Sequence, residues 1–168
     1  MKYKNVFGIV GWKNSGKTGL VVRLVTEISQ RGFSVSTIKH AHHDFDIDRP
    51  GKDSFRHREA GAKQTILSSK RRWALMNELC RDDEPNLEQL ISKLTPVDLV
   101  LVEGFKKDLN LKLETYRVET GERLLAESRH DILAVASNFN DLNINIPVFN
   151  LDDTNAVADF ILKKVGLS

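Results

Sequence analysis

The sequence predicts a three-layer α/β domain with a mostly parallel sheet and some antiparallel strands. Two observations indicate this class. Short apolar runs typical of buried strands recur along the chain, and segments with helical periodicity separate several of them. A strand, a helix and a second strand in succession form a βαβ unit, which implies parallel pairing and a right-handed crossover. With 168 residues the chain has the usual length of one domain, so we expect a single domain over residues 1–168.

The βαβ unit lies at the start of the chain. Residues 6–10 form an apolar run that Gly11 ends, which predicts a buried strand. A helix is predicted from Thr18 onward, and Gly32 stands where a helix C-terminal glycine belongs. The apolar positions with helical spacing are Leu20, Val21, Leu24, Val25 and Ile28. Residues 33–38 then predict the second strand.

The middle of the chain is predicted to hold shorter elements. In order, they are a loop over 40–52, a short helix over 53–60, strands over 64–68 and 73–77 with a basic turn between them, and a helix that Asn86 caps. The apolar stripe of that last helix is Leu87, Leu90, Ile91 and Leu94.

The remaining part contains the most apolar strand, over 97–102, and Glu103 closes it. Residues 112–118 alternate between apolar and polar, which predicts an edge or antiparallel strand. The last expected elements are buried strands over 132–136 and 147–149 and an amphipathic helix over 154–165.

One motif carries the functional argument. The segment 11–18 matches G-x-x-x-x-G-K-[ST] at every position, with a strand before it and a helix after it, as a P-loop NTPase requires. Backbone N–H groups and the helix dipole would hold a polyphosphate, Lys17 would reach its β- and γ-phosphates in a catalytic role, and Thr18 would bind Mg²⁺. The expected nucleotide contacts are Gly11, Lys13, Asn14, Ser15, Gly16, Lys17, Thr18 and Gly19.

A second acidic group is expected near the metal, because a P-loop protein holds Mg²⁺ with a carboxylate at the end of a neighbouring strand. Glu103 ends the apolar strand and is our candidate, so Thr18 and Glu103 form the predicted metal site. Asp98, at the opposite end of that strand, is interpreted as a surface or capping residue.

The polar loop after the second strand offers further candidates. Asp46 or Asp48 could act as an outer magnesium ligand or position water, and we take Asp46 as the catalytic candidate. The histidines His40, His42 and His43 could bind a metal or could form a polar surface loop. From Lys39 to Arg72 there are nine Lys or Arg and five Asp or Glu, so this stretch is either a seat for an anionic ligand, with Arg56 and Arg58 as its clamp, or a solvated basic face.

Composition excludes several classes of function. The net charge of +2 gives no case for nucleic acid or an anionic membrane, and no window approaches 18 uncharged apolar residues. The single cysteine, Cys80, suits a reducing compartment, so we expect a cytoplasmic protein.

The choice of base is weakly encoded. Asn138 follows the apolar strand over 132–136, where many P-loop proteins bind the base, and it could pair with guanine or simply stand in a turn. The N-K-x-D string of the common GTPases does not occur.

The P-loop together with four further segments resembles the MobB family of molybdopterin-guanine dinucleotide biosynthesis proteins. These segments are residues 38–62, with K-H-x-H-H followed by D-x-D-x-P-G-K-D-S, and residues 71–78, 98–106 and 132–137. The resemblance implies GTP as ligand with Mg²⁺, weak GTPase activity, and an adapter role in the guanylation of molybdenum cofactor. It also implies the molybdenum cofactor guanylyltransferase as partner, molybdopterin cofactor as a further candidate ligand, and a homodimer.

Two rival functions use the same phosphate site. A small-molecule kinase would hold its acceptor with Arg56 and Arg58 and would need an arginine-bearing lid. A metal-delivery NTPase would use the histidine cluster.

Overall fold

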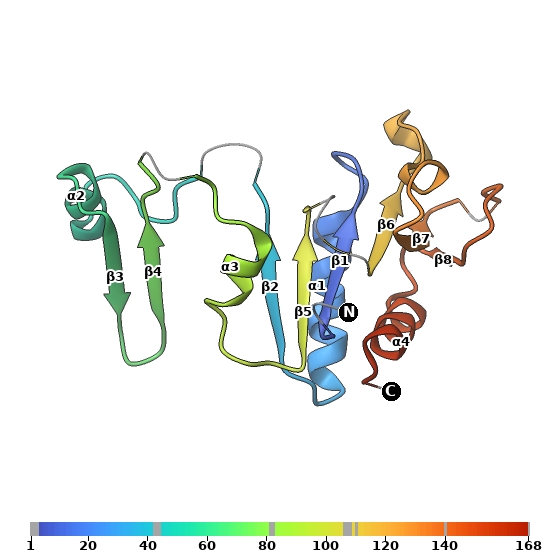
Figure 1. The fold of residues 1–168 in the computed structure, drawn as a ribbon, viewed down its shortest axis with the longest axis horizontal. Helices are drawn as coiled ribbons and strands as arrows, with labels where there is room; N and C mark the ends of the chain where they lie inside the picture. The colour runs from blue at the N-terminus through green and yellow to red at the C-terminus, as the bar shows by residue number, and fades with distance from the viewer. Residues whose placement is uncertain are drawn as a thin grey trace. The chain divides into compact units, whose positions relative to one another are not determined.

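The computed structural model describes residues 4–41, 45–80, 83–105, 109, 111–139 and 141–167. The chain forms two compact units, one made of Met1–His40 with Leu87–Ser168 and the other of Ala41–Asn86. Each unit has its own sheet (Figure 1). The expectation of a single domain over residues 1–168 stays a prediction.

The larger unit is built on a six-stranded sheet in the order β2-β5-β1-β6-β7-β8, and the described pairings in it are all parallel. The strands span Val6–Val10 (β1), Val35–Lys39 (β2), Leu99–Glu103 (β5), Lys112–Tyr116 (β6), Ile132–Ser137 (β7) and Val148–Asn150 (β8). This sheet confirms the predicted fold class.

Two long helices cover one face of this sheet. They are α1 (Lys17–Gln30) and α4 (Thr154–Val165), as their periodicity predicts. Alternate residues of β1, Phe7 and Ile9, are fully buried on this face, in one cluster with Leu20 of α1 and other apolar side chains of both helices. Each large apolar side chain buried in this way contributes about 1.5–3 kcal/mol to folding.

The opposite face is covered by the short helix α3 (Leu87–Ile91), which begins directly after Asn86. Leu87 is buried against Val6 and Val100, and the predicted stripe residues pack on the same cluster. The sheet therefore lies between two helical layers, and the three-layer prediction is confirmed.

Strand β6 differs from the prediction of an edge or antiparallel strand over 112–118. It lies inside the sheet, parallel to β1 and β7. The alternation comes from two buried charged side chains, Lys112 and Glu114, which are 1% and 0% exposed. Lys112 forms an ion pair with Asp131, and Glu114 accepts two backbone N–H groups, each at 2.9 Å, from the 3₁₀ turn Leu125–Glu127. A polar position in this strand therefore marks a satisfied buried charge and not an exposed face.

The smaller unit contains α2 (Asp53–Glu59) and an antiparallel pair, β3 (Gln64–Ser68) and β4 (Trp73–Asn77). Both strands have the predicted bounds. The basic turn between them closes with a hydrogen bond of 2.9 Å from the N–H of Ser69 to the carbonyl of Arg72. No helix among the described residues is both long and apolar enough to cross a membrane.

Candidate nucleotide-binding site

The phosphate loop connects β1 to α1, and its backbone requires glycine at both ends. Gly11 has φ +149°, and a Cβ there would lie 2.5 Å from the carbonyl oxygen of Thr115. Gly16 is the N-cap of α1 with φ +95°, and as a glycine it has no side chain that could cap the helix. The N–H groups of the first helical turn have no partner within the helix, so the N-terminal end of α1 is suited to bind an anion.

The side chain of Ser15, in the phosphate loop, has a structural role. Ser15 is 2% exposed, and its Oγ lies 2.7 Å from Oγ1 of Thr115 on β6. The Ser15 hydroxyl therefore faces the sheet, and a contact from Ser15 to phosphate would come from the backbone N–H. Lys13 and Asn14 are exposed in the loop, and Gly19 is exposed in the first turn of α1.

Lys17 reaches back across the loop. Its Nζ donates to the carbonyl of Trp12 at 2.5 Å, and the Trp12 indole Nε1 donates to the carbonyl of Arg123 at 2.8 Å. The Lys17 ammonium thus contacts the start of the loop, where it can exchange the Trp12 carbonyl for phosphate oxygens.

Thr18 and Glu103 meet beside the loop. Oγ1 of Thr18 donates to Oε1 of Glu103 at 2.8 Å, and Nζ of Lys39 lies 3.4 Å from the same carboxylate oxygen. Parallel pairing of β5 with β1 and β2 sets Glu103 opposite Ile9 and Lys39, at the carboxyl edge of the sheet. A hydroxyl and a carboxylate at this distance are the hard oxygen donors that Mg²⁺ takes alongside phosphate. The residues present therefore fit a magnesium ion.

The histidine cluster is only partly within the described residues. The His40 ring packs on Phe105, with centroids 4.7 Å apart, and its backbone N–H donates to the Glu103 carbonyl at 2.9 Å. His42, His43 and Asp44 lie outside the described residues. Within the ranges that the structure describes, no group of three or more His, Cys, Asp or Glu side chains could hold a metal ion.

Asp46 and Asp48 belong to the smaller unit, where Arg58 holds both. Nη2 of Arg58 lies 2.9 Å from Asp46 and 3.1 Å from Asp48, and its Nε lies 3.8 Å from Glu78. The hydrogen bond to Asp48 is the main cause that raises the pKa of Arg58. Arg58, predicted as part of an anion clamp, is therefore surrounded by carboxylates, while Arg56 is exposed on α2.

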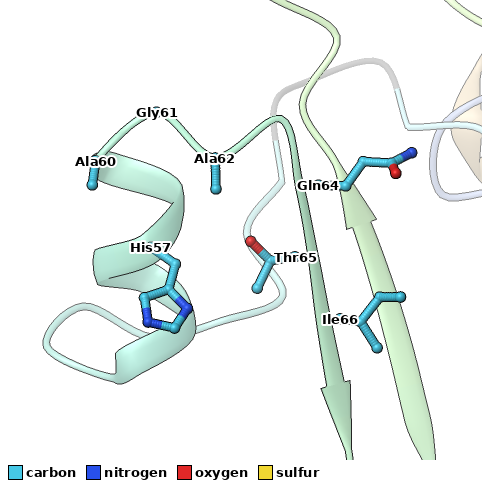
Figure 2. Close-up of a pocket in the computed structure, with 7 residues that line it drawn as sticks. All are labelled: His57, Ala60, Gly61, Ala62, Gln64, Thr65 and Ile66. Atoms are coloured by element: carbon cyan, nitrogen blue, oxygen red, sulfur yellow. The ribbon is translucent and has the colours of Figure 1, made fainter.

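The described residues of the smaller unit line two pockets of interest. One, of about 560 Å³, lies beside the end of α2 and the start of β3, with the His57 ring and Thr65 on its wall (Figure 2). The other, of about 770 Å³, is lined by Arg58 and by the acidic residues Asp46, Asp48, Glu78 and Glu84. Arg58 is the one Lys or Arg residue of the basic stretch 39–72 that lines either of these two pockets.

The connection from β6 to β7 contributes residues that the sequence argument missed. Nε of Arg117 lies 3.3 Å from the position that a Cβ on Gly16 would occupy. Glu119 lies in the same connection, and both of its carboxylate oxygens accept from Nδ2 of Asn138, the predicted candidate for the base contact, at 2.7 and 2.9 Å. The sequence predicts an edge or antiparallel strand over 112–118, whereas β6 lies parallel to β1 and directly beside it, which brings the segment after β6 to the phosphate loop.

The comparison with known families agrees with this geometry. A sequence model of molybdopterin guanine dinucleotide synthesis protein B, MobB, matches residues 6–138. The chain belongs to the MobB family. The matched stretch includes the phosphate loop, Glu103 and Asn138.

Relatives of this MobB-family chain extend over nearly its full length. The molybdopterin-guanine dinucleotide biosynthesis adapter protein of Escherichia coli strain K12 is 40% identical over 162 residues, which cover 94% of this chain and 91% of that protein. The adapter protein of Haemophilus influenzae is 40% identical over 158 residues, covering 93% and 86%. The solved structure of a MobB homolog from Bacillus stearothermophilus superposes with a TM-score of 0.72 at 27% identity, over 98% of this chain and 99% of that one.

Proposed function

We propose that this chain is a GTP-binding adapter in the synthesis of molybdopterin guanine dinucleotide. The observation that carries the nucleotide part is the pairing of Thr18 with Glu103 beside a glycine-bounded phosphate loop. The adapter part is supported by the relatives of the MobB family, which are adapter proteins of this synthesis.

The chain's own residues would bind the triphosphate in a defined way. Backbone N–H groups of the loop and of the first turn of α1 would surround the β-phosphate, and Lys17 would leave the Trp12 carbonyl for the β- and γ-oxygens. Thr18 and Glu103 would hold Mg²⁺, which neutralises phosphate charge when bound. Lys39, next to Glu103, would limit the negative charge that the carboxylate adds to the site.

We expect hydrolysis to be slow, because fast phosphoryl transfer needs a positioned water and an added cation, which a partner can supply. Asp46 stays our candidate for positioning that water, and Asp46→Asn should then slow hydrolysis without weakening GTP binding. Turnover by the isolated chain faster than about 1 s⁻¹ would contradict an adapter role.

Binding of GTP and ATP in Mg²⁺, measured by calorimetry, tests the proposal. A preference of the native chain for GTP, together with loss of nucleotide binding in Lys17→Ala, would support it. The matched control is Lys163→Ala, at an exposed lysine near the far end of α4. Equal affinity for the two nucleotides would remove the guanine-specific role.

A homodimer and a cytoplasmic location are part of the same proposal. The β3–β4 pair exposes Ile66, Trp73 and Leu75, at 66%, 66% and 41%. Ile66 lies opposite Leu75, and Trp73 lies two residues before Leu75, so all three share one face of the pair. Such a contiguous apolar face is typical of an interface, and a second copy would bury it. The free thiol of Cys80 is in keeping with a reducing compartment.

Sedimentation tests the dimer. We expect the double substitution Ile66→Asp and Leu75→Asp to yield monomers, whereas Val22→Asp, at a position 61% exposed on α1, should leave the association unchanged. A monomeric native chain at all concentrations would refute this part of the proposal.

The guanylyltransferase is the proposed protein partner, and molybdopterin cofactor is a further candidate ligand. Co-sedimentation with purified guanylyltransferase, with and without GTP, tests the first. If the two proteins sediment separately both with and without GTP, the result would count against an adapter that acts by direct contact.

A further inference from the structure

The sheet has a topological switch point between β1 and β6. The chain leaves β1 through α1 toward β2 on one side, and it leaves β6 toward β7 on the other (Figure 1). Ligands of open α/β sheets bind in the crevice outside the carboxyl ends of the strands at such a point. Since the phosphate loop follows β1, the segments that follow β6 and β7 are placed to contact the rest of a bound nucleotide.

Three contacts hold β6 and the segment that follows it against the phosphate loop. The Trp12 indole donates to the carbonyl of Arg123, the Ser15 hydroxyl meets Thr115, and the Arg117 guanidinium lies against Gly16. A nucleotide whose phosphates lie on the loop would therefore extend along Arg117. Strand β7 is two strand spacings from β1, about 10 Å, which a sugar and the inner phosphate can span.

A carboxylate in the turn after β6 and an amide directly after β7 already face each other. Asn138 donates through Nδ2 to both oxygens of Glu119, and both side chains are exposed. The pKa of Glu119 is lowered, first by its own backbone N–H, then by the Asn138 amide, with a further contribution from the charge of Arg117. Glu119 is thus ionised at neutral pH and can only accept hydrogen bonds.

We infer that Glu119 and Asn138 form the pair of side chains that recognises the guanine base in this chain. The Glu119 carboxylate accepts from N1–H and the 2-amino group of guanine, and the Asn138 amide donates to O6. Adenine reverses this pattern, with an amino donor in place of O6 and a bare ring nitrogen in place of N1–H. The inference rests on the proposed GTP binding and assigns the residues that give its specificity.

The mutual hydrogen bonds of the pair are compatible with binding the base. A carboxylate has about four acceptor positions and an amide nitrogen two N–H groups, so the pair can keep one mutual bond while each partner contacts guanine. The arrangement also fixes the two side chains before the base arrives, which lowers the ordering cost of binding.

The substitution Glu119→Gln tests the pair with little change in shape. We expect the affinity for GTP to fall about 10- to 100-fold, with affinity for ATP unchanged. Affinity for xanthosine triphosphate should rise, because the glutamine carbonyl accepts from N1–H while its amide donates to the 2-oxo group. Inosine triphosphate, which lacks the 2-amino group, should bind the native chain more weakly than GTP does.

Two controls separate a local effect from a general one. Magnesium tripolyphosphate should bind Glu119→Gln as it binds the native chain, which shows that the phosphate loop is intact. Asp141→Asn removes another exposed carboxylate, three residues after Asn138, and should keep the preference for GTP.

The outcomes are distinguishable. A retained GTP preference in Glu119→Gln, or its loss in Asp141→Asn, would overturn the inference and leave the proposed function standing. Equal affinity of the native chain for GTP and ATP would overturn the guanine-specific function and this inference together, before any substitution is made. Loss of GTP affinity with a gain of affinity for xanthosine triphosphate would support the pair, because a merely structural role of Glu119 predicts no such gain.

Discussion

Oγ1 of Thr18 donates a hydrogen bond of 2.8 Å to Oε1 of Glu103, and this contact joins the first turn of α1 to the end of β5. The two residues are 85 positions apart in the chain, yet they form one oxygen-rich corner beside the phosphate loop. Thr18 and Glu103 would hold a magnesium ion here, the carboxylate directly or through water, and the ion would neutralise phosphate charge.

The first prediction concerns Glu103→Gln. The amide keeps a partner for Thr18 but removes the negative charge, so the Mg²⁺ concentration needed for half-maximal GTP binding should rise about 10- to 100-fold. Calorimetric titrations of GTP over a series of Mg²⁺ concentrations measure this change. In excess EDTA the variant and the native chain should bind GTP with similar, weak affinity.

Asp98→Asn is the matched control, because Asp98 precedes the same strand at its other end. Asp98 accepts from the N–H and the hydroxyl of Ser34, at 2.7 and 2.6 Å, and the Ser34 hydroxyl is the main cause that lowers its pKa. The substitution should change stability and leave the Mg²⁺ dependence alone. An Mg²⁺ dependence shifted equally by both substitutions would show that Glu103 has no special place in the metal site.

The second prediction concerns acid stability and Asp131. The guanidinium of Arg129, with a further contribution from the Lys112 ammonium, lowers the pKa of Asp131 from 3.8 to about 2. A carboxyl with a lowered folded-state pKa stabilises the fold above its unfolded pKa, and this contribution is lost as the pH falls from about 4 to about 2. After allowance for its partial exposure, the pH-dependent part is about 1 kcal/mol.

Asp131→Asn should therefore lower the free energy of unfolding at pH 7, and the difference from the native chain should shrink toward pH 2. The loss at pH 7 should reach about 2–3 kcal/mol, because the buried Lys112 ammonium also loses its carboxylate partner. Urea titrations at a series of pH values measure both. Asp152→Asn, where the carboxylate is 79% exposed and 3.6 Å from Arg23, should cost under about 0.5 kcal/mol at every pH.

Local patterns predicted the parts of the fold that depend on neighbours in the chain. The turn between β3 and β4 and the apolar stripe of α4 both arise from short-range geometry, and their observed bounds equal the predicted ones. The motif likewise predicted the phosphate loop, and strand polarity predicted that Glu103 would end a strand at the same edge of the sheet.

The features that could not be predicted depend on pairing between strands and side chains far apart in the sequence. The place of β6 depends on whether Lys112 and Glu114 find partners at Asp131 and in the turn Leu125–Glu127, and nothing near them in the sequence encodes those partners. The meeting of Glu119 with Asn138 has the same cause, since it follows from the adjacency of β6 and β7. The prediction of an edge or antiparallel strand over 112–118 gives no reason to expect the segment after it in the nucleotide site.

The last prediction concerns Gly11→Ala. An added Cβ would lie 2.5 Å from both the Thr115 carbonyl oxygen and Oγ of Ser15, in a backbone conformation that alanine rarely adopts. Backbone strain and overpacking together should lower the free energy of unfolding by about 3 kcal/mol. GTP binding should fall as well, because relief of the clash displaces the loop from β6.

Gly32→Ala isolates the backbone contribution. Gly32 follows α1 with φ +92° and has no atom within 4 Å of the added Cβ, so only strain applies and the loss should be about 1 kcal/mol. Urea titrations of the two variants give the difference between them, which measures the close approach of the loop to Thr115. Equal losses would mean that the loop moves away from β6 at little cost, and the contact would then be no constraint on the phosphate site.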